Sequence, residues 1–219
     1  LKDDASTYTY EDREATNGCQ YQVVIKDANN VERKTSIVTA ASATLKAGDA
    51  IDLDGQTYYL GGNALANGSF EMGFTGWTDG KGNTLAAPYF QVVSAGGNDG
   101  QTYLQAYGNG GSSSESAVNT QFDLNANTNY YFSVASCNMP GGISCRVGPG
   151  REGSTSISPK MYIDNKTTNW VTQFISFNSG ESTLGRIQLY NLAAKAQIDQ
   201  VLLCQLYSTR DSAIADGIE

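Results

Sequence analysis

The feature that most constrains this chain is a regular series of strand-like segments between residues 63 and 207. Apolar and polar side chains alternate along these segments, and loops rich in Gly, Ser and Asn separate them. No segment shows a helical period. The candidate strands are 64–72, 88–94, 102–107, 116–124, 129–137, 157–164, 170–178, 184–191 and 197–207. The pattern predicts an all-β, antiparallel sandwich, with the loops 95–101, 108–115 and 138–156 between strands.

Composition excludes several classes of partner. Charged residues make up 16% of the chain, against about 25% in an average soluble protein, and the net charge is −8. An acidic surface repels nucleic acid and anionic lipid. No apolar run approaches the ~20 residues of a membrane-spanning helix. Because the chain starts at Leu1, with no Met and no signal peptide, we expect a processed or excised piece of a longer polypeptide.

The first 62 residues predict a separate small β segment. Three strands are expected at 6–11, 20–26 and 32–40. They resemble the last three strands of a fibronectin type III domain, and Asn17-Gly18 with Tyr21 resembles its tyrosine corner, although the first strands of that sandwich are missing. Asp54-Gly55 predicts a hairpin turn between 50–53 and 56–60. We place the boundary at Gly61-Gly62, which gives 1–62, a sandwich at 63–208, and a tail or linker at 209–219.

Two stretches carry a resemblance to a known family. Asn67–Gly76 reads NGSFEMGFTG with Trp77 directly after, and Ala196–Tyr207 reads AQIDQVLLCQLY. They resemble the opening and closing strands of the jelly-roll carbohydrate-binding modules attached to bacterial xylanases and glucanases, a galactose-binding-domain-like β-sandwich. The resemblance implies a non-catalytic glycan-binding module. It also implies a structural calcium held by Glu71 and Asp199, although the same carboxylates could be paired or solvated without a metal.

Jelly-roll pairing of eight of these strands, with 64–72 as an addition, predicts two sheets. The first holds 88–94, 116–124, 170–178 and 197–207, and the second holds 102–107, 129–137, 157–164 and 184–191. Successive residues of a strand point to opposite faces. In each strand of the second sheet one face is apolar, and the other is rich in Tyr, Gln, Arg and Lys. Strand 170–178 is apolar on both faces, so we expect its outer side to be covered.

The polar face of the second sheet is the predicted binding site. Sugar rings suit flat aromatic surfaces edged by planar donors and acceptors. The candidate ligand-binding residues are Tyr103, Gln105, Tyr107, Tyr131, Lys160, Tyr162, Arg186, Gln188 and Tyr190. The alternative is an ordinary solvated face, because Tyr is also a good strand former. Trp77 and Trp170 are expected to be structural.

The four cysteines do not predict a metal site, since their spacing fits no zinc motif and the chain has no His. Cys137 and Cys145 flank a turn-rich loop and could form a disulfide in an exported protein, or remain free thiols. Cys204 is expected to be a small buried hydrophobe.

Catalysis is not expected. Without His there is no Ser-His or Cys-His pair, and phosphate-binding motifs are absent. A glycosidase could use two carboxylates, and Asp164, Glu115 and Glu152 are the candidates, but no pair stands out. The predicted function is a glycan-binding module of a larger secreted or surface protein, with a polysaccharide or oligosaccharide as partner. A spacer domain without ligand and a jelly-roll glycosidase or lyase are the alternatives.

Overall fold

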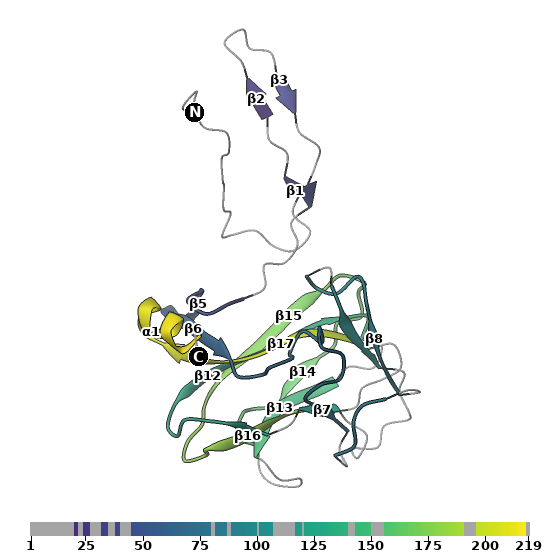
Figure 1. Cartoon of the computed structure of the whole chain (residues 1–219). Coiled ribbons are helices and arrows are strands. Elements are labelled where there is room, and N and C mark those ends of the chain that lie inside the picture. The colour runs from purple at the N-terminus through teal and green to yellow at the C-terminus, as the bar shows by residue number, and fades with distance from the viewer. Residues whose placement is uncertain are drawn as a thin grey trace. The chain divides into compact units, whose positions relative to one another are not determined.

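The computed structural model divides into two compact units, Leu1–Ala43 and Thr44–Glu219 (Figure 1). The residues it describes are 20–21, 24–26, 32–34, 38–39, 45–79, 82–86, 89–99, 101–106, 117–119, 121–139, 143–149, 156–190 and 196–217. In the first unit, β1 (Gln20–Tyr21) pairs with β4 (Val38–Thr39), and β2 (Val24–Lys26) pairs with β3 (Glu32–Lys34). Both pairs are antiparallel. The first expected strand, 6–11, and Asn17-Gly18 lie outside the described residues.

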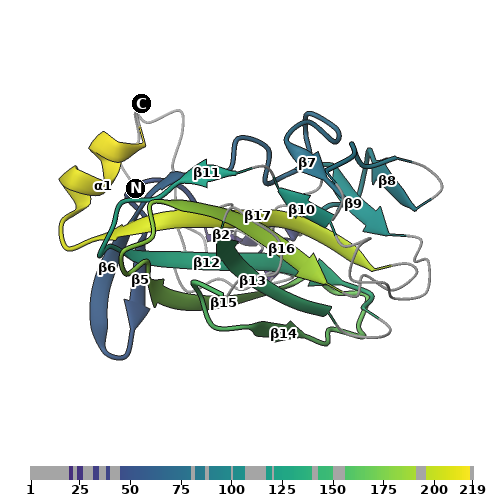
Figure 2. The same ribbon diagram turned by 90° about the horizontal axis from the view of Figure 1, so that it is seen from below.

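The second unit is a sandwich of two antiparallel sheets, which confirms the predicted fold class. The β17 sheet has the order β15-β12-β17-β6-β5, and β9 pairs with both β17 and β8. Its strands are β5 (Ala50–Leu53), β6 (Gln56–Asn63), β8 (Phe90–Val93), β9 (Tyr103–Ala106), β12 (Asn129–Cys137), β15 (Val171–Asn178) and β17 (Gln197–Tyr207). Figure 2 shows β12, β15 and β17 running side by side in this layer.

The β16 sheet forms the other layer, in the order β14-β13-β16-β10-β7, and β11 also pairs with β16. Its strands are β7 (Trp77–Thr78), β10 (Ala117–Asn119), β11 (Phe122–Asp123), β13 (Ile143–Pro149), β14 (Met161–Ile163) and β16 (Leu184–Tyr190). One apolar face of each sheet turns inward, so that Leu104 and Phe132 of the β17 sheet share a core with Ile187 of the β16 sheet. Burial of this core is the main stabilising contribution to the fold.

Residues 64–72 are a turn-rich loop rather than the predicted opening strand. Asn67 is buried and organises the loop: its Nδ2 donates to the carbonyls of Gly73 (3.0 Å) and Thr75 (2.9 Å), and its Oδ1 accepts from Met72 N–H (3.0 Å). Phe70 has a φ of 60° and stacks near Trp77, with ring centroids 4.9 Å apart. The motif therefore forms a compact loop that packs on the core. In an extended strand, the Asn67 side chain could not reach the carbonyls of Gly73 and Thr75, which lie six and eight residues further along the chain.

The hairpin at 50–63 belongs to the sandwich, which corrects the predicted boundary at Gly61-Gly62. The turn is as expected, since Asp54 and Gly55 both have positive φ (55° and 81°). Strand β6 then pairs with β17, with Tyr59 opposite Tyr207. This long-range pairing adds the hairpin to the β17 sheet, and the compact unit accordingly begins at Thr44.

The predicted distribution of strands between sheets is wrong for three segments. Segments 102–107 and 129–137 lie in the β17 sheet, and 116–124 lies in the β16 sheet. The first error arises because 88–94 and 102–107 form a local hairpin, β8–β9, instead of alternating between sheets. Side-chain alternation shows which residues face inward, but both sheets have an inward face, so it cannot assign a strand to a sheet.

The expected tail contains a helix. Helix α1 (Arg210–Asp216) is capped at its N-terminus by Thr209, whose side chain accepts a hydrogen bond from Ser212 N–H. Ala213 is fully buried, and Asp216 accepts from Gly62 N–H (2.9 Å). Figure 2 shows the helix beside the β5–β6 hairpin. No helix among the described residues is long and apolar enough to cross a membrane.

Three of the four cysteines, Cys137, Cys145 and Cys204, are buried free thiols, and Cys19 is outside the described residues. The disulfide between Cys137 and Cys145 is not formed. Instead the Cys137 thiol donates to the carbonyl of Thr168 (3.2 Å), and Cys145 faces the core. The expectation that Cys204 is a small buried hydrophobe is confirmed.

Candidate functional site

Polar side chains gather on the outer surface of three adjacent strands, which we name the β16 face. Its residues are Ser144, Arg146 and Gly148 of β13, Tyr162 of β14, and Arg186 and Gln188 of β16. Each alternates with an inward residue of the core, such as Cys145, Ile163 or Ile187. The register sets Arg146 opposite Gln188, and Ser144 opposite both Tyr162 and Tyr190.

Arg146 is held in a fixed orientation on the β16 face. Its Nε donates to Gln188 Oε1 (2.6 Å), and its Nη1 donates to Ser156 Oγ (2.6 Å). Gln188 is only 2% exposed, although it points outward. A Cβ on Gly148 would lie 2.7 Å from the Gln188 carboxamide, so the glycine makes room for this side chain. The result is a planar cation with ordered donors rather than a mobile surface arginine.

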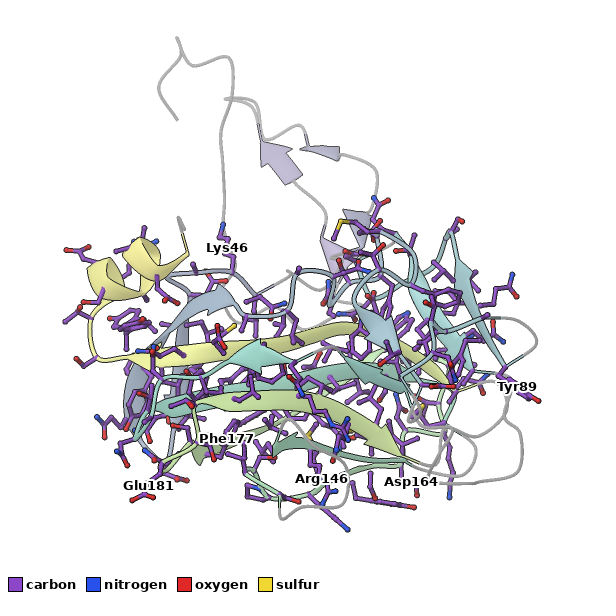
Figure 3. All side chains as sticks on the ribbon, turned by 60° about the horizontal axis from the view of Figure 1, so that its bottom comes forward. Lys46, Tyr89, Arg146, Asp164, Phe177 and Glu181 are labelled. Atoms are coloured by element: carbon purple, nitrogen blue, oxygen red, sulfur yellow. The ribbon has the colours of Figure 1, made fainter. Side chains whose placement is uncertain are left out.

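An aromatic and a second guanidinium complete the β16 face. Tyr162 is 61% exposed, and it lies diagonally across from Arg146, at a Cα separation of about 7–8 Å for such neighbours. The Nε of Arg186 is buried and has no hydrogen-bond partner. Arg186 and Gly148 face each other across the strand pair. Figure 3 shows Arg146 among the sticks, with Asp164 beyond the end of β14.

Four of the nine predicted binding residues lie on or beside these strands, namely Lys160, Tyr162, Arg186 and Gln188, and a fifth, Tyr190, ends strand β16. Tyr190 is placed by register, and Lys160 is exposed just before β14. Tyr103, Gln105 and Tyr131 lie on the β17 sheet instead, so the predicted common surface of Tyr103 and Tyr190 is contradicted. Tyr107 lies outside the described residues.

The tyrosines of the β17 sheet have local partners. Tyr103 is buried against Trp170 (centroids 5.7 Å apart, edge-on), and its hydroxyl accepts from Gln197 Nε2 (3.2 Å). Tyr131 stacks on Phe174, with centroids 5.2 Å apart. Trp77 is a core residue, as expected, and Trp170 is tied to the Gly96 carbonyl (2.9 Å).

Sequence reasoning missed strand β13, and with it Arg146. The whole of 138–156 had the Gly and Ser content of a loop. The signal was nevertheless present in Ile143–Val147, ISCRV, where Ile, Cys and Val alternate with Ser and Arg. Ser156, the second partner of Arg146, lies just past the undescribed residues 151–155.

A second polar cluster lies at the edge of the sandwich, around Asp199. This carboxylate is fully buried and accepts hydrogen bonds from Asn98 N–H (2.7 Å) and Gln200 N–H (2.6 Å). Burial raises the pKa of Asp199 to about 7, the two N–H donors lower it, and the charges of Asp99 and Glu71 raise it further.

Glu71 comes close to this cluster from the Asn67 loop. Its Oε1 accepts from Thr102 N–H (3.1 Å) and Thr102 Oγ1 (2.8 Å), and Thr102 Oγ1 donates to the Ser69 carbonyl (3.1 Å). A Cβ on Gly97 would meet the Thr102 carbonyl and Asp199 Oδ2. Within the described ranges, no three acidic, His or Cys side chains converge as a metal site. Any cation here therefore needs main-chain carbonyls or water as additional ligands.

The carboxylate candidates for catalysis are not assembled into a site. Asp164 forms an ion pair with Lys166 (3.3 Å) at the surface, and Glu115 and Glu152 lie outside the described residues. Asp164 is therefore paired with a neighbouring lysine and not with a second carboxylate.

Comparisons with known proteins find similar folds among solved structures. A family 16 carbohydrate-binding module matches 64% of this chain and 99% of its own length, with 17% identity and a TM-score of 0.47. A family 61 module, solved with β-1,4-galactotriose, matches 65% and 98%, with 17% identity and a TM-score of 0.46. The CBM22-1 xylan-binding domain of Paenibacillus barcinonensis Xyn10C matches 67% and 97%, with 15% identity and a TM-score of 0.46.

Other matches are parts of enzymes. An arabinofuranosidase is matched over 27% of its chain, so the likeness concerns one portion of that enzyme. No protein-family model matches this sequence, and no curated protein matches it. At these identities the resemblance concerns the fold, and the ligands belong to the proteins in which they were seen.

Proposed function

We propose that the β16 face binds a glycan and that the chain is a non-catalytic module of a larger exported protein. The observation that carries this proposal is the Arg146–Gln188–Ser156 network on the outer side of an antiparallel sheet. Keeping an arginine in one orientation costs side-chain entropy. Donors that are already ordered before binding lose less entropy when the ligand binds, so a preorganised arginine favours ligand binding.

The chemistry of the face suits sugar hydroxyls. Arg146 and Arg186 bring two planar guanidinium groups to the face, and their N–H groups are donors suited to hydroxyl oxygens. The exposed ring of Tyr162 offers a flat apolar surface to the C–H face of a sugar. Hydrogen bonds from charged groups contribute about 1.5–3 kcal/mol each, so one arginine is worth roughly a tenfold to hundredfold change in affinity.

The test is a glycan array probed with the full chain, followed by titration calorimetry on a retained glycan. We expect Arg146→Ala and Tyr162→Ala each to weaken binding at least tenfold. Tyr89→Ala is the matched control, because Tyr89 is also exposed (46%) and precedes β8 of the other sheet (Figure 3). If no glycan is retained, the spacer interpretation replaces this one. If a glycan is retained and all three variants bind it alike, the β16 face is not its binding site.

The same proposal includes a structural calcium ion near Asp199. Calcium takes six to eight oxygen ligands, often carboxylates with main-chain carbonyls. Glu71 and Asp199 would supply carboxylate oxygens. A cation would offset the cost of burying Asp199, which Asp99 and Glu71 increase by repulsion.

Calcium that binds only the folded state raises the melting temperature. We expect calcium to raise the melting temperature of the full chain after chelator treatment, and Asp199→Asn to abolish that rise. Asp164→Asn, at an exposed ion pair, should leave the rise intact. An identical melting curve with calcium and with chelator would exclude the ion.

A further inference from the structure

Strand β15 is a long sheet edge without a charge, and this sets it apart from the other edges. It lies at the end of the β17 sheet and pairs along its whole length with β12 only. Its sequence, VTQFISFN, contains no Asp, Glu, Lys, Arg, Pro or Gly. Its neighbour in the other layer, β14, lies close to it, and Gln173 Nε2 of β15 donates a hydrogen bond to the Tyr162 carbonyl of β14 (3.5 Å). Among the described residues no second strand pairs with the outer backbone groups of β15, which leaves a row of donors and acceptors that another strand could meet.

The other described edges carry the features that normally prevent strand addition. Strand β5 is four residues long and contains Asp52, followed by Asp54 in the turn. Strand β14 is three residues long and lies between Lys160 and Asp164. Strands β7 and β8 have two and four residues. Only β15, with eight residues, is both long and uncharged among the edges that the structure describes.

The exposed side chains of β15 add an apolar surface to this edge. Phe174 is 51% exposed and Val171 is 44% exposed, while Phe174 packs one side of its ring on Tyr131. Large apolar side chains at an open edge favour contact with another strand. We propose that β15 is a self-association edge, where a second copy of this chain adds its own β15 antiparallel and joins the two β17 sheets.

The order of residues in β15 supports a second copy as the occupant. In an antiparallel pair, residues directly opposite each other point to the same face. A two-fold axis at Phe174 sets Phe174 opposite Phe174 and Thr172 opposite Ser176. On the other face, Gln173 then lies opposite Ile175, and Val171 opposite Phe177. Aromatic meets aromatic and hydroxyl meets hydroxyl, which are favourable cross-strand pairs.

Charge supports the same choice of partner. Each copy carries a net charge of −8, so two copies repel one another over most of their surface. The uncharged β15 is a place where they can approach without setting like charges opposite each other. The edge is about 27 Å long, so its pairing alone buries less area than the ~1,200 Å² of a stable complex. We therefore expect a weak dimer, with a dissociation constant on the order of 100 µM.

The first test is sedimentation velocity of the full chain from about 5 µM to about 1 mM, a range chosen to bracket that dissociation constant. We expect monomer at the low end and dimer at the high end. Phe174→Lys sets two lysines opposite each other at the axis and should weaken dimerisation at least tenfold, because directly opposed like charges are destabilising.

Ser176→Lys provides a second variant that keeps both rings of the Tyr131–Phe174 stack, although Ser176 lies opposite Tyr131. It should also weaken the dimer, since Ser176 is exposed and lies in the same pairing. Gln56→Lys is the matched control: it makes the same change in net charge at an exposed position on β6 and should leave the dimer intact. Melting curves establish that each variant is folded.

The register is tested by disulfide trapping in a Cys19→Ser background, where the described cysteines are buried. Phe174→Cys should form a disulfide-linked dimer under mild oxidation, and Thr172→Cys should not, because Thr172 lies opposite Ser176. A monomer throughout the concentration range overturns the proposal and leaves β15 to a strand of another protein. A dimer that survives both lysine variants overturns it as well, since another surface then holds the copies together.

Discussion

The Asn67 side chain is the most informative single position for stability, because one carboxamide holds the whole loop from 67 to 77 in place. Asn67→Ala removes two donors, to the Gly73 and Thr75 carbonyls, and one acceptor, for Met72 N–H. Asn67 is 4% exposed, so water does not readily replace these partners. At roughly 1 kcal/mol of net stability for each hydrogen bond, the expected loss is about 3 kcal/mol.

The loss should be measured by urea unfolding followed by tryptophan fluorescence. Both tryptophans, Trp77 and Trp170, lie in the second unit, so the signal reports on the sandwich alone. A loss of about 3 kcal/mol corresponds to a fall in melting temperature of about 6–12 °C for a unit of this size. Asn67→Asp should cost at least as much, because its carboxylate would face two carbonyl oxygens.

Asn83→Ala is the matched control. Asn83 is exposed, and its side chain makes one hydrogen bond, to Asp79 (2.9 Å). Exposed contacts of this kind contribute little, so the expected loss is below about 0.5 kcal/mol. If Asn67→Ala costs no more than Asn83→Ala, the loop does not depend on this side chain and the reasoning fails.

Three further predictions concern Gly68, α1 and Cys204. Gly68→Ala should lower the unfolding free energy by about 1–3 kcal/mol, because its Cβ would clash with the Val201 carbonyl. Thermal melting measures this loss, and an unchanged melting temperature would show that the backbone moves to accommodate the Cβ. Removing residues 208–219 should lower the unfolding free energy by about 2 kcal/mol in the same assay, because the hydrogen bonds from Gly62 to Asp216 and from Arg210 to Gly48 (3.3 Å) are lost. An unchanged melting temperature would mean that α1 does not stabilise the fold. Burial raises the pKa of Cys204 from its ordinary value of 9.0 to about 12, so the unfolded chain loses this proton first and stability falls as pH rises from 9 towards 12. Cys204→Ala should reduce that slope by about 1.4 kcal/mol per pH unit, and equal slopes in the two proteins would contradict the burial of this thiol.

Local patterns in the sequence predict the local features of the structure. The inward and outward faces of 157–164 and 184–191 are as expected, because alternation follows directly from strand geometry. Asp54-Gly55 forms its turn, because positive φ at both residues favours these residue types. The helix after Thr209 was missed, although Thr209 and Asp211 are the cap and first-turn residues that would have indicated it.

What the sequence could not predict depends on contacts between distant residues. The pairing of β6 with β17 joins residues about 145 positions apart, and nothing near either strand specifies it. The sheet to which Tyr103 belongs was misassigned for the same reason. The motif at Asn67 shows another limit, since its alternation resembles a strand while its Asn, Gly and buried Phe70 form a turn with a positive φ.

The contacts of α1 have a mechanical consequence for the sandwich. Arg210 reaches the Gly48 carbonyl, and Gly217 packs against Ala47, so the entry and exit of this unit lie side by side. A stretching force applied to the two ends of this unit would act first on the contacts between α1 and residues 47–48. We expect the helix to separate from the β5–β6 hairpin before the paired strands come apart. The same proximity would allow a short linker to join 217 to 45 while new ends were opened at the exposed Asp54-Gly55 turn, giving a circularly permuted sandwich.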